Sequence, residues 1–397
     1  MKQKLSLVCL VCNLILVASL TGQDLAKPEQ AVRFATFNAS LYRDAAGKLL
    51  KDLEAGKHPE IRKVAEIVQQ VRPDVLLLNE FDFDPSGNAV KLLKEKYLEQ
   101  SQNGQTPIEY EYVFSAESNT GIDSGFDLNH DGKTGSPDDA FGFGKHPGQY
   151  GMLVLSKYPI DAKAVRTFQK FLWKDLPGAL LPIDPKTSKP WYDEPTTAAF
   201  RLSSKSHWDV PITVGEKTVH FLVCHPTPPV FDGAEDRNGL RNHDEIRFWA
   251  EYISGSESVY DDAGKKGGLK QDDSFVIAGD LNADPNDGDS RDRPTVRLLE
   301  HPLVQDPQPK SAGGVEQAEK QGQMNAKHKG DPALDTGDFG DKNVGNLRID
   351  YVLPSKNLKV LGSGVFWPAA DKPEFKLVDC SDHRLVWVDV EVTTNER

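Results

Sequence analysis

The stretch Phe275–Pro285 has the sequence FVIAGDLNADP. Its first residues are apolar and turn-forming residues bound them, which predicts a short buried strand. Gly279 ends the apolar run, and Asp280 and Asn282 follow it two positions apart. In an extended chain, side chains at positions i and i+2 point to the same face. The pattern therefore predicts that a carboxylate and a carboxamide leave the end of a strand together, where α/β proteins place their chemistry.

The segments before this stretch favour a layered α/β fold. Residues 32–37 alternate in polarity and predict a strand, residues 59–71 have apolar positions at helical spacing, and residues 75–78 form a continuous apolar run. This strand–helix–strand crossover is typical of layered α/β proteins. Helices are also expected over 89–98 and 242–253, and strands over 110–114, 151–155, 196–202, 211–214, 219–224, 347–353 and 386–392. No repeat or linker appears, so we expect one domain over residues 31–393.

Three insertions interrupt the regular pattern near residues 117–149, 166–208 and 305–345. The first is rich in Gly and Asp. The second carries prolines and aromatic residues, and we expect it to pack over one rim of the domain. Within it, Lys205–His207 could face a site, although a surface loop is the simpler interpretation. The third is rich in Gly, Gln, Asp and Lys, which predicts an irregular surface loop.

Residues 1–22 have the features of a signal peptide. Lys2 and Lys4 precede an apolar run over residues 5–20, which is short for a membrane anchor and is followed by polar sequence. We expect cleavage and a secreted or periplasmic protein without a membrane span, and an uncleaved anchor is the alternative.

Charge and cysteine content narrow the class of protein further. The net charge of the whole chain is -13, and without Lys2 and Lys4 the remaining 45 basic and 60 acidic residues give -15. Tight nonspecific binding of a nucleic-acid backbone calls for a basic surface instead. Cys224 and Cys380 remain after cleavage, and the sequence leaves open whether they form a disulfide or are separate buried thiols. We expect a monomer.

Polar residues collect at the ends of the predicted strands. They are Asn38, Glu80, His225, Asp280, Asn282 and the pair Asp382–His383, while Asp350 lies within an apolar strand. Each alone has an ordinary structural explanation, such as a turn cap or a solvated carboxylate. Together they are a set of oxygen ligands and imidazoles that suits Mg²⁺ or Mn²⁺. A zinc site would use more histidine or thiolate.

Six sequence blocks resemble, in order, those of the endonuclease/exonuclease/phosphatase superfamily. The GDLNADP stretch resembles the G-D-x-N motif of this family. The other five blocks are Thr36–Asn38, Leu78–Glu80, residues 151–160 (GMLVLSKYPI), Arg348–Tyr351 (RIDY) and Ser381–His383 (SDH). The second of these reads N-E where the family more often has Q-E. In addition, Cys224–His225 lies where deoxyribonuclease-like members have a catalytic histidine. The resemblance covers residues 31–393 apart from the insertions.

The resemblance implies a deoxyribonuclease I-like fold: a four-layer α/β/β/α sandwich of two mixed β-sheets flanked by helices. It also implies metal-dependent hydrolysis of phosphoric esters by direct attack of water. Glu80, with Asn38 and Asp382, would hold a divalent ion that stabilises charge on the phosphoryl oxygens.

The same resemblance implies roles for five further residues. His383 would act as general acid or base, oriented by Asp350. Asp280 would position or deprotonate the attacking water, and Asn282 would orient the phosphate or a second metal. His225 would donate a hydrogen bond to a phosphate oxygen.

The first insertion contains a second metal-binding pattern. Asp127, Asn129, Asp131, Lys133 and Asp138 occupy positions 1, 3, 5, 7 and 12 of a loop with glycine at position 6. This spacing suits a calcium loop and resembles EF-hand and dockerin loops, except that position 12 is Asp and no helix pair flanks the loop. We predict a structural Ca²⁺ site, and a solvated acidic loop is the alternative.

The sequence leaves the substrate class open. A small organophosphate or a lipid headgroup fits the acidic charge best, a nuclease of the same fold is the alternative, and a noncatalytic binding protein is less expected. Arg241 and Asn242 follow His225 and could contact substrate, although a solvated helix start explains them equally well.

Overall fold

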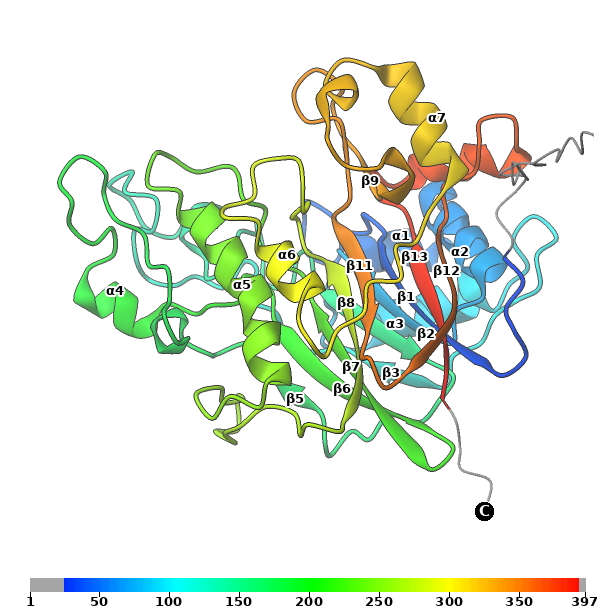
Figure 1. Ribbon diagram of the computed structural model, residues 1–397, viewed down its shortest axis with the longest axis horizontal. Helices are drawn as coiled ribbons and strands as arrows, with labels where there is room; N and C mark the ends of the chain where they lie inside the picture. The colour runs from blue at the N-terminus through cyan, green and yellow to red at the C-terminus, as the bar shows by residue number, and fades with distance from the viewer. Residues whose placement is uncertain (1–24, 393–397) are drawn as a thin grey trace, which may run out of the picture.

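The computed structural model describes residues 25–392, and two β-sheets packed face to face form its centre (Figure 1). The first sheet has six strands in the order β12-β13-β1-β2-β4-β3, and the second has five in the order β11-β8-β7-β6-β5. The strands of the first are β1 (Ala31–Asn38), β2 (Val75–Asn79), β3 (Tyr112–Phe114), β4 (Met152–Ser156), β12 (Lys359–Val365) and β13 (Val386–Glu391). Those of the second are β5 (Arg166–Thr167), β6 (His207–Val214), β7 (Lys217–Cys224), β8 (Ser274–Asp280) and β11 (Asp350–Pro354).

Helices cover the outer face of each sheet. The first sheet is covered by α1 (Lys48–Glu54), α2 (Pro59–Val71) and α3 (Asn88–Leu93), with a π-helical turn over Lys94–Leu98. The second is covered by α5 (Arg237–Ile253) and α6 (Pro294–Leu299), on the opposite side of the molecule in Figure 1. Both sheets contain parallel and antiparallel pairs. The predicted four-layer α/β/β/α sandwich is therefore confirmed.

Alternating side chains along each strand explain the layers. In β1, Phe34 belongs to the core between the sheets, whereas Ala35 and Phe37 face the helices of the first layer. In β8, Val276 lies between the sheets and Ile277 faces the α5 side. Strands buried on both faces are continuously apolar. This is why the runs at residues 75–78 and 275–278 are apolar without a polar face.

The chain direction brings strand ends to one end of the sandwich. β1 and β2 are parallel, with Asn38 beside Asn79, and β7 and β8 are parallel in the other sheet. Asn38 at the end of β1 donates a hydrogen bond of 3.0 Å to Asp280 at the end of β8. Residues from both sheets therefore meet in one site, as expected for the carboxyl ends of strands in layered α/β proteins.

Three secondary-structure predictions are wrong. The predicted strand over 347–353 is interrupted, because residues 348 and 349 belong to no strand and Asp350 begins β11 instead of lying within a strand. Residues 196–202 do not form a strand, because the chain begins the helix α4 (Glu194–Ala199) there, where Asp193 accepts a capping hydrogen bond from the backbone of Thr196. The segment 305–345 is not an irregular loop throughout. It contains α7 (Ala312–Gln321), capped by Ser311, and the short pair β9 (Gly337–Asp338) and β10 (Asn346–Leu347).

The predicted signal peptide, residues 1–22, lies outside the described residues. Within residues 25–392, no helix has the length and apolar character needed to cross a membrane. Cys224 and Cys380 are both free and buried, so the disulfide that the sequence left open does not form.

Candidate active site

The end of β8 depends on a glycine. Gly279 has a φ of 152°, and a Cβ atom there would lie 2.0 Å from the carbonyl oxygen of Cys224 on the neighbouring strand. No other residue fits this approach without displacing β7. The next residue, Asp280, is thereby held at the strand end with a buried side chain.

Asp280 and Asn282 reach the same cavity by a geometry different from the predicted one. The chain turns after Asp280: Asn282 has a left-handed φ of 52°, and its backbone N–H donates to Asp280 Oδ1 at 2.8 Å. The extended i, i+2 arrangement is therefore wrong. Asn282 Nδ2 is anchored on the carbonyl oxygen of Pro226 at 3.1 Å, and both side chains still line one cavity.

Asp280 Oδ2 is the centre of the site. Asn38 Nδ2 lies 3.0 Å from it, His225 Nε2 3.3 Å and His383 Nε2 3.6 Å. Burial opposes ionisation of this carboxyl group, but the charge of His383 and the hydrogen bond from His225 hold the pKa of Asp280 below its ordinary value. Asp280 is therefore an ionised acceptor and a weak base.

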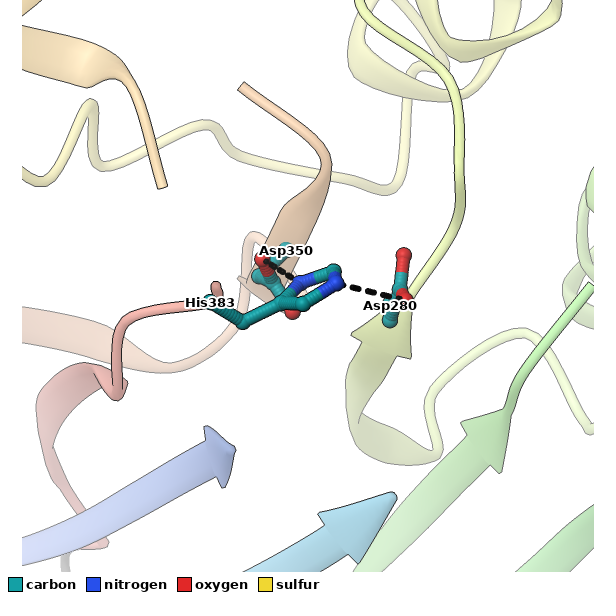
Figure 2. Close-up of side chains that lie close together, drawn as sticks. All are labelled: Asp280, Asp350 and His383. Carbon is teal, nitrogen blue, oxygen red and sulfur yellow. Dashed lines mark hydrogen bonds and ion pairs between the residues drawn. The ribbon is translucent and has the colours of Figure 1, made fainter. Parts of the chain in front are cut away.

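His383 lies between two carboxylates (Figure 2). Its Nδ1 donates to Asp350 Oδ2 at 2.9 Å, and Thr336 Oγ1 donates to the same oxygen at 2.9 Å. Burial alone would lower the pKa of His383, but the charges of Asp350 and Asp280 raise it to about 10. The imidazole is therefore protonated at neutral pH, and the prediction that Asp350 orients it agrees with this geometry.

Glu80 follows β2 directly and has a left-handed φ of 61°. For a residue other than glycine this conformation costs about 1–2 kcal/mol, so the surrounding structure holds the side chain at the cavity in spite of strain. Burial raises the pKa of Glu80 to about 7, while the charge of His383 and a hydrogen bond from Asn38 oppose the rise. A carboxylate destabilised in this way would gain from a nearby cation.

The predicted metal ligands fit a hard divalent ion by their chemistry. Glu80 and Asp382 line the cavity, Asp382 is exposed, and Asn38 contacts Glu80. Two carboxylates and a carboxamide are oxygen ligands of the type that Mg²⁺ and Mn²⁺ prefer.

A second arrangement of possible metal ligands overlaps the first. Within residues 25–392, Asp280, Asp350 and His383 are the one set of three acidic, histidine or cysteine side chains whose ligand atoms lie within 4.8 Å of one another. Metal binding requires a neutral imidazole, whereas His383 is protonated and already bonded to Asp350. The hydrogen bond between His383 and Asp350 favours acid–base chemistry for this set, and metal binding by Glu80, Asn38 and Asp382 stays a prediction.

His225 differs in state from His383. Burial and then the charge of Lys205 lower the pKa of His225 to about 4, so it is neutral. A neutral imidazole has one N–H. The Nε2 atom faces Asp280, whereas Nδ1 is buried without a hydrogen-bond partner. In this structure the N–H of His225 is directed to Asp280, and donation to a phosphate oxygen stays a prediction.

Lys205 lies in the site, which is the less favoured of the two interpretations of Lys205–His207. The interpretation as a surface loop is wrong for Lys205–His207, because all three residues are buried and Lys205 lines the cavity. Burial lowers the pKa of Lys205, and Glu245 and Glu80 oppose this effect. The polar sequence around Lys205 is typical of a loop, so no local pattern distinguished the two interpretations.

Arg241 and Asn242 are used by the fold itself. Arg241 is buried and donates to the carbonyl oxygens of Leu202 at 2.8 Å and Phe141 at 2.6 Å. Asn242 donates to the carbonyl oxygens of Thr227 and Leu281. Arg241 lies in the cavity wall and Asn242 does not. The hydrogen-bond donors of both residues therefore hold α5 against neighbouring loops.

The predicted calcium loop folds around its own backbone. Asp127 accepts from the backbone N–H groups of Asp131 and Gly132, and Asn129 accepts from that of Asp131 at 3.1 Å. Asp131 Oδ1 accepts from the N–H of Lys133, and Asp138 lines the active-site cavity. The carboxylates of Asp127, Asp131 and Asp138 do not form a close set of three. Calcium binding here stays a prediction.

The active-site residues surround a cavity of about 740 Å³ at the end of the sandwich. Asp280, His383, Glu80 and Lys205 lie in its lining together with residues from all three insertions. The volume lies within the range of roughly 300–1,000 Å³ that is common for small-molecule sites. The site therefore has room for a phosphoryl group and a further organic group.

The model of the Endonuclease/Exonuclease/phosphatase family matches residues 35–383. No sequence among the curated proteins matches the chain.

Several solved structures are similar to the chain at low sequence identity and with TM-scores below 0.5. A family protein from Leptotrichia buccalis C-1013-b has 17% identity and a TM-score of 0.48, covering 91% of this chain and 100% of that chain. One from Beutenbergia cavernae DSM 12333 has 18% identity and a TM-score of 0.47, covering 91% and 72% respectively. The human nocturnin catalytic domain with bound sulfate has 13% identity and a TM-score of 0.45, covering 93% and 97%.

The family assignment itself rests on the family model, which spans most of the chain and includes every predicted catalytic and metal-binding residue. The chain belongs to the endonuclease/exonuclease/phosphatase family of hydrolases that act on phosphoric ester bonds.

Proposed function

We propose that this protein is a divalent-metal-dependent phosphoesterase that hydrolyses phosphomonoesters or phosphodiesters by attack of water at phosphorus. The observation that carries the proposal is the position of His383, whose two ring nitrogens lie 2.9 Å from Asp350 and 3.6 Å from Asp280 in a cavity that Glu80 also lines. Such a site offers a proton donor, a fixed carboxylate and a metal-binding carboxylate around one small space.

His383 is the proton donor in this proposal. The Nδ1–H of His383 is bonded to Asp350, whereas Nε2 forms an ion pair at 3.6 Å with Asp280 but no short hydrogen bond. With substrate bound, the Nε2–H would donate a proton to the leaving oxygen or a hydrogen bond to a phosphoryl oxygen. Lys205 adds a second positive charge in the cavity lining. Positive groups fixed before the reaction stabilise the charge that develops on the phosphoryl oxygens.

Asp280 orients the attacking water. Its pKa is held below the ordinary value, so it accepts a hydrogen bond from water more readily than it accepts a proton. Asn38 and His225 keep the carboxylate in place. Of the two roles predicted for Asp280, positioning the water and deprotonating it, the low pKa favours positioning.

The divalent ion would be held by Glu80, Asn38 and Asp382. When bound, it neutralises charge on the phosphoryl oxygens. We infer Mg²⁺ or Mn²⁺ from the oxygen ligands alone.

The test uses one panel of substrates with matched variants. p-Nitrophenyl phosphate, bis-p-nitrophenyl phosphate, plasmid DNA and sphingomyelin are each incubated with Mg²⁺, Mn²⁺, Ca²⁺ or EDTA. We expect EDTA to abolish hydrolysis and Mg²⁺ or Mn²⁺ to restore it, and His383→Ala to lower kcat by about 10²–10⁴-fold. Glu80→Gln should abolish the response to metal.

Controls for this panel lie away from the site. His301 is a partly exposed histidine bonded to Ser254, and Glu216 is exposed, so His301→Ala and Glu216→Gln should retain activity. Full activity in EDTA would refute the metal dependence, and wild-type rates in His383→Ala would refute the site. Efficient cleavage of plasmid DNA alone would favour the nuclease alternative, and folded protein that hydrolyses nothing would favour a binding protein.

We also propose that the protein is exported and that residues 1–22 are removed. The basic start and apolar run of that segment support this. N-terminal sequencing of protein from an expressing culture tests it: a new N-terminus between residues 19 and 24 is expected, and an intact Met1 would refute it.

A further inference from the structure

We propose that the substrate is a phosphoric ester that carries a bulky apolar group, and that this group binds against an apolar rim at the mouth of the cavity. The rim consists of Phe143, Phe231 and Val344. The inference rests on the proposed phosphoesterase function and adds the class of substrate to it.

The rim residues are unusually exposed for their type. Phe231 is 83% exposed, Phe143 50% and Val344 37%. In the part of the chain that the structure describes, six large hydrophobic side chains are exposed, and these three line the one cavity that contains His383. Exposed apolar side chains that gather in one place mark a binding surface, whereas single ones are ordinary.

The three residues come from different segments. Phe143 belongs to the insertion 117–149, Phe231 to the loop between β7 and α5, and Val344 to the turn between β9 and β10. They are far apart in sequence, so no local structure forces them together. Further apolar side chains line the same cavity: Leu128, Pro228, Pro229, Val230, Phe339 and Leu347.

The charge of the lining selects against an extended polyanion. Seven carboxylate side chains line the cavity: Glu80, Asp138, Asp280, Asp284, Asp287, Asp289 and Asp382. Four basic side chains lie among them: Lys205, Arg237, Arg241 and His383. Arg237 is paired with Glu235, and Arg241 is bonded to backbone carbonyl groups. A nucleic-acid backbone would bring several phosphates to this acidic surface. A single phosphate with an apolar group avoids that repulsion.

The size of the cavity supports the same class of substrate. About 740 Å³ lies within the usual range of drug-sized sites, so a phosphoryl group at His383 leaves space toward the rim. Water released from Phe143 and Phe231 by an apolar group would contribute to binding, because burial of apolar surface is favourable.

The experiment compares alkyl 4-nitrophenyl phosphate diesters with methyl, butyl and octyl groups, at concentrations where each is monomeric. In the wild type, kcat/KM should rise with chain length, by at least about tenfold from methyl to octyl, since each buried CH₂ group favours binding. Phe231→Ser and Phe143→Ser should each reduce the octyl-to-methyl ratio of kcat/KM by about tenfold. Ile183, which is 53% exposed and lies outside the cavity lining, provides the control: Ile183→Ser should not change the ratio.

The outcomes separate the two proposals. If no diester and no substrate of the earlier panel is hydrolysed, the phosphoesterase function is wrong. If the diesters are hydrolysed but methyl and octyl esters react equally well, the apolar substrate class is overturned while the phosphoesterase function stands. A preference for the octyl ester that Phe231→Ser and Phe143→Ser leave intact would overturn the assignment to the rim.

Discussion

Replacing Asp350 with asparagine should lower the pKa of His383 in protein freed of divalent ions with EDTA. In the wild type, His383 Nδ1 lies 2.9 Å from Asp350 Oδ2 and the pKa of His383 is raised to about 10. An opposite charge at this distance typically shifts a pKa by about 1–3, so the variant should titrate between about pH 7 and pH 9. Asparagine retains an oxygen that can accept from Thr336 Oγ1, so the local packing should persist.

The raised pKa of His383 also makes the stability of the fold depend on pH. A folded-state pKa raised above the ordinary value of about 6.5 stabilises the fold below that pH. The contribution is lost as the pH rises through about 10 in the wild type. In Asp350→Asn the loss should begin at the same pH, near the ordinary value of about 6.5, but end at lower pH than in the wild type. Denaturant unfolding between pH 7 and pH 10 should therefore show a smaller pH-dependent decrease in stability.

The assay is an NMR titration of the imidazole nitrogens. A second histidine–carboxylate pair provides the control: His220 Nδ1 lies 2.7 Å from Asp209 Oδ1, and the pKa of His220 is also raised, although burial opposes it. Asp209→Asn should lower the pKa of His220 and leave His383 unchanged. If His383 still titrates near pH 10 in Asp350→Asn, the carboxylate is not the cause and the proposed role of Asp350 fails.

Three further changes test other parts of the structure. Gly279→Ala should lower the melting temperature strongly or prevent folding, because its Cβ would lie 2.0 Å from the Cys224 carbonyl oxygen, whereas Gly340→Ala, with open space around it, should melt as the wild type does. Asp389→Asn should lower the free energy of unfolding in urea by about 3–5 kcal/mol, because it leaves buried Arg33 without its bidentate partner. Lys359→Ala removes an exposed lysine that pairs with Glu391 and should lower it by less than about 1 kcal/mol. Equal losses in the two variants would contradict this reasoning. Ca²⁺ should raise the melting temperature if the loop 127–138 binds it, and Asp127→Ala should remove the rise; an identical rise in both proteins would place calcium elsewhere.

Most of the fold could be predicted from local pattern. The apolar runs at residues 75–78 and 275–278 form strands that are buried on both faces. The helical spacing of apolar residues over 59–71 correctly predicted α2. The failures have local causes too. Capping by Asp193 starts a helix where two threonines favoured a strand, and capping by Ser311 starts one in a segment whose composition suggested a loop.

The residue types of the active site could be predicted from the sequence, but their protonation states could not. The sequence indicated that Asp280, Asp350 and His383 act together, but the charge of each depends on distances that no sequence pattern contains. Two histidines show this difference: His383 is protonated because two carboxylates flank it, and His225 is neutral because it is buried beside Lys205. The sequence left open whether Lys205 faces the site, because burial of a polar loop depends on what packs over it.

The sequence by itself determined the family, the layered fold and the residues able to carry phosphoester chemistry, because strand pattern and short motifs depend on neighbouring residues. Only the tertiary structure decided which of these residues meet, what charge they carry and what surrounds them. Phe143, Phe231 and Val344 lie in three unrelated segments, and only folding brings them to the mouth of the cavity. The physical reason is that pKa values, cavities and apolar surfaces arise from contacts between distant parts of the chain.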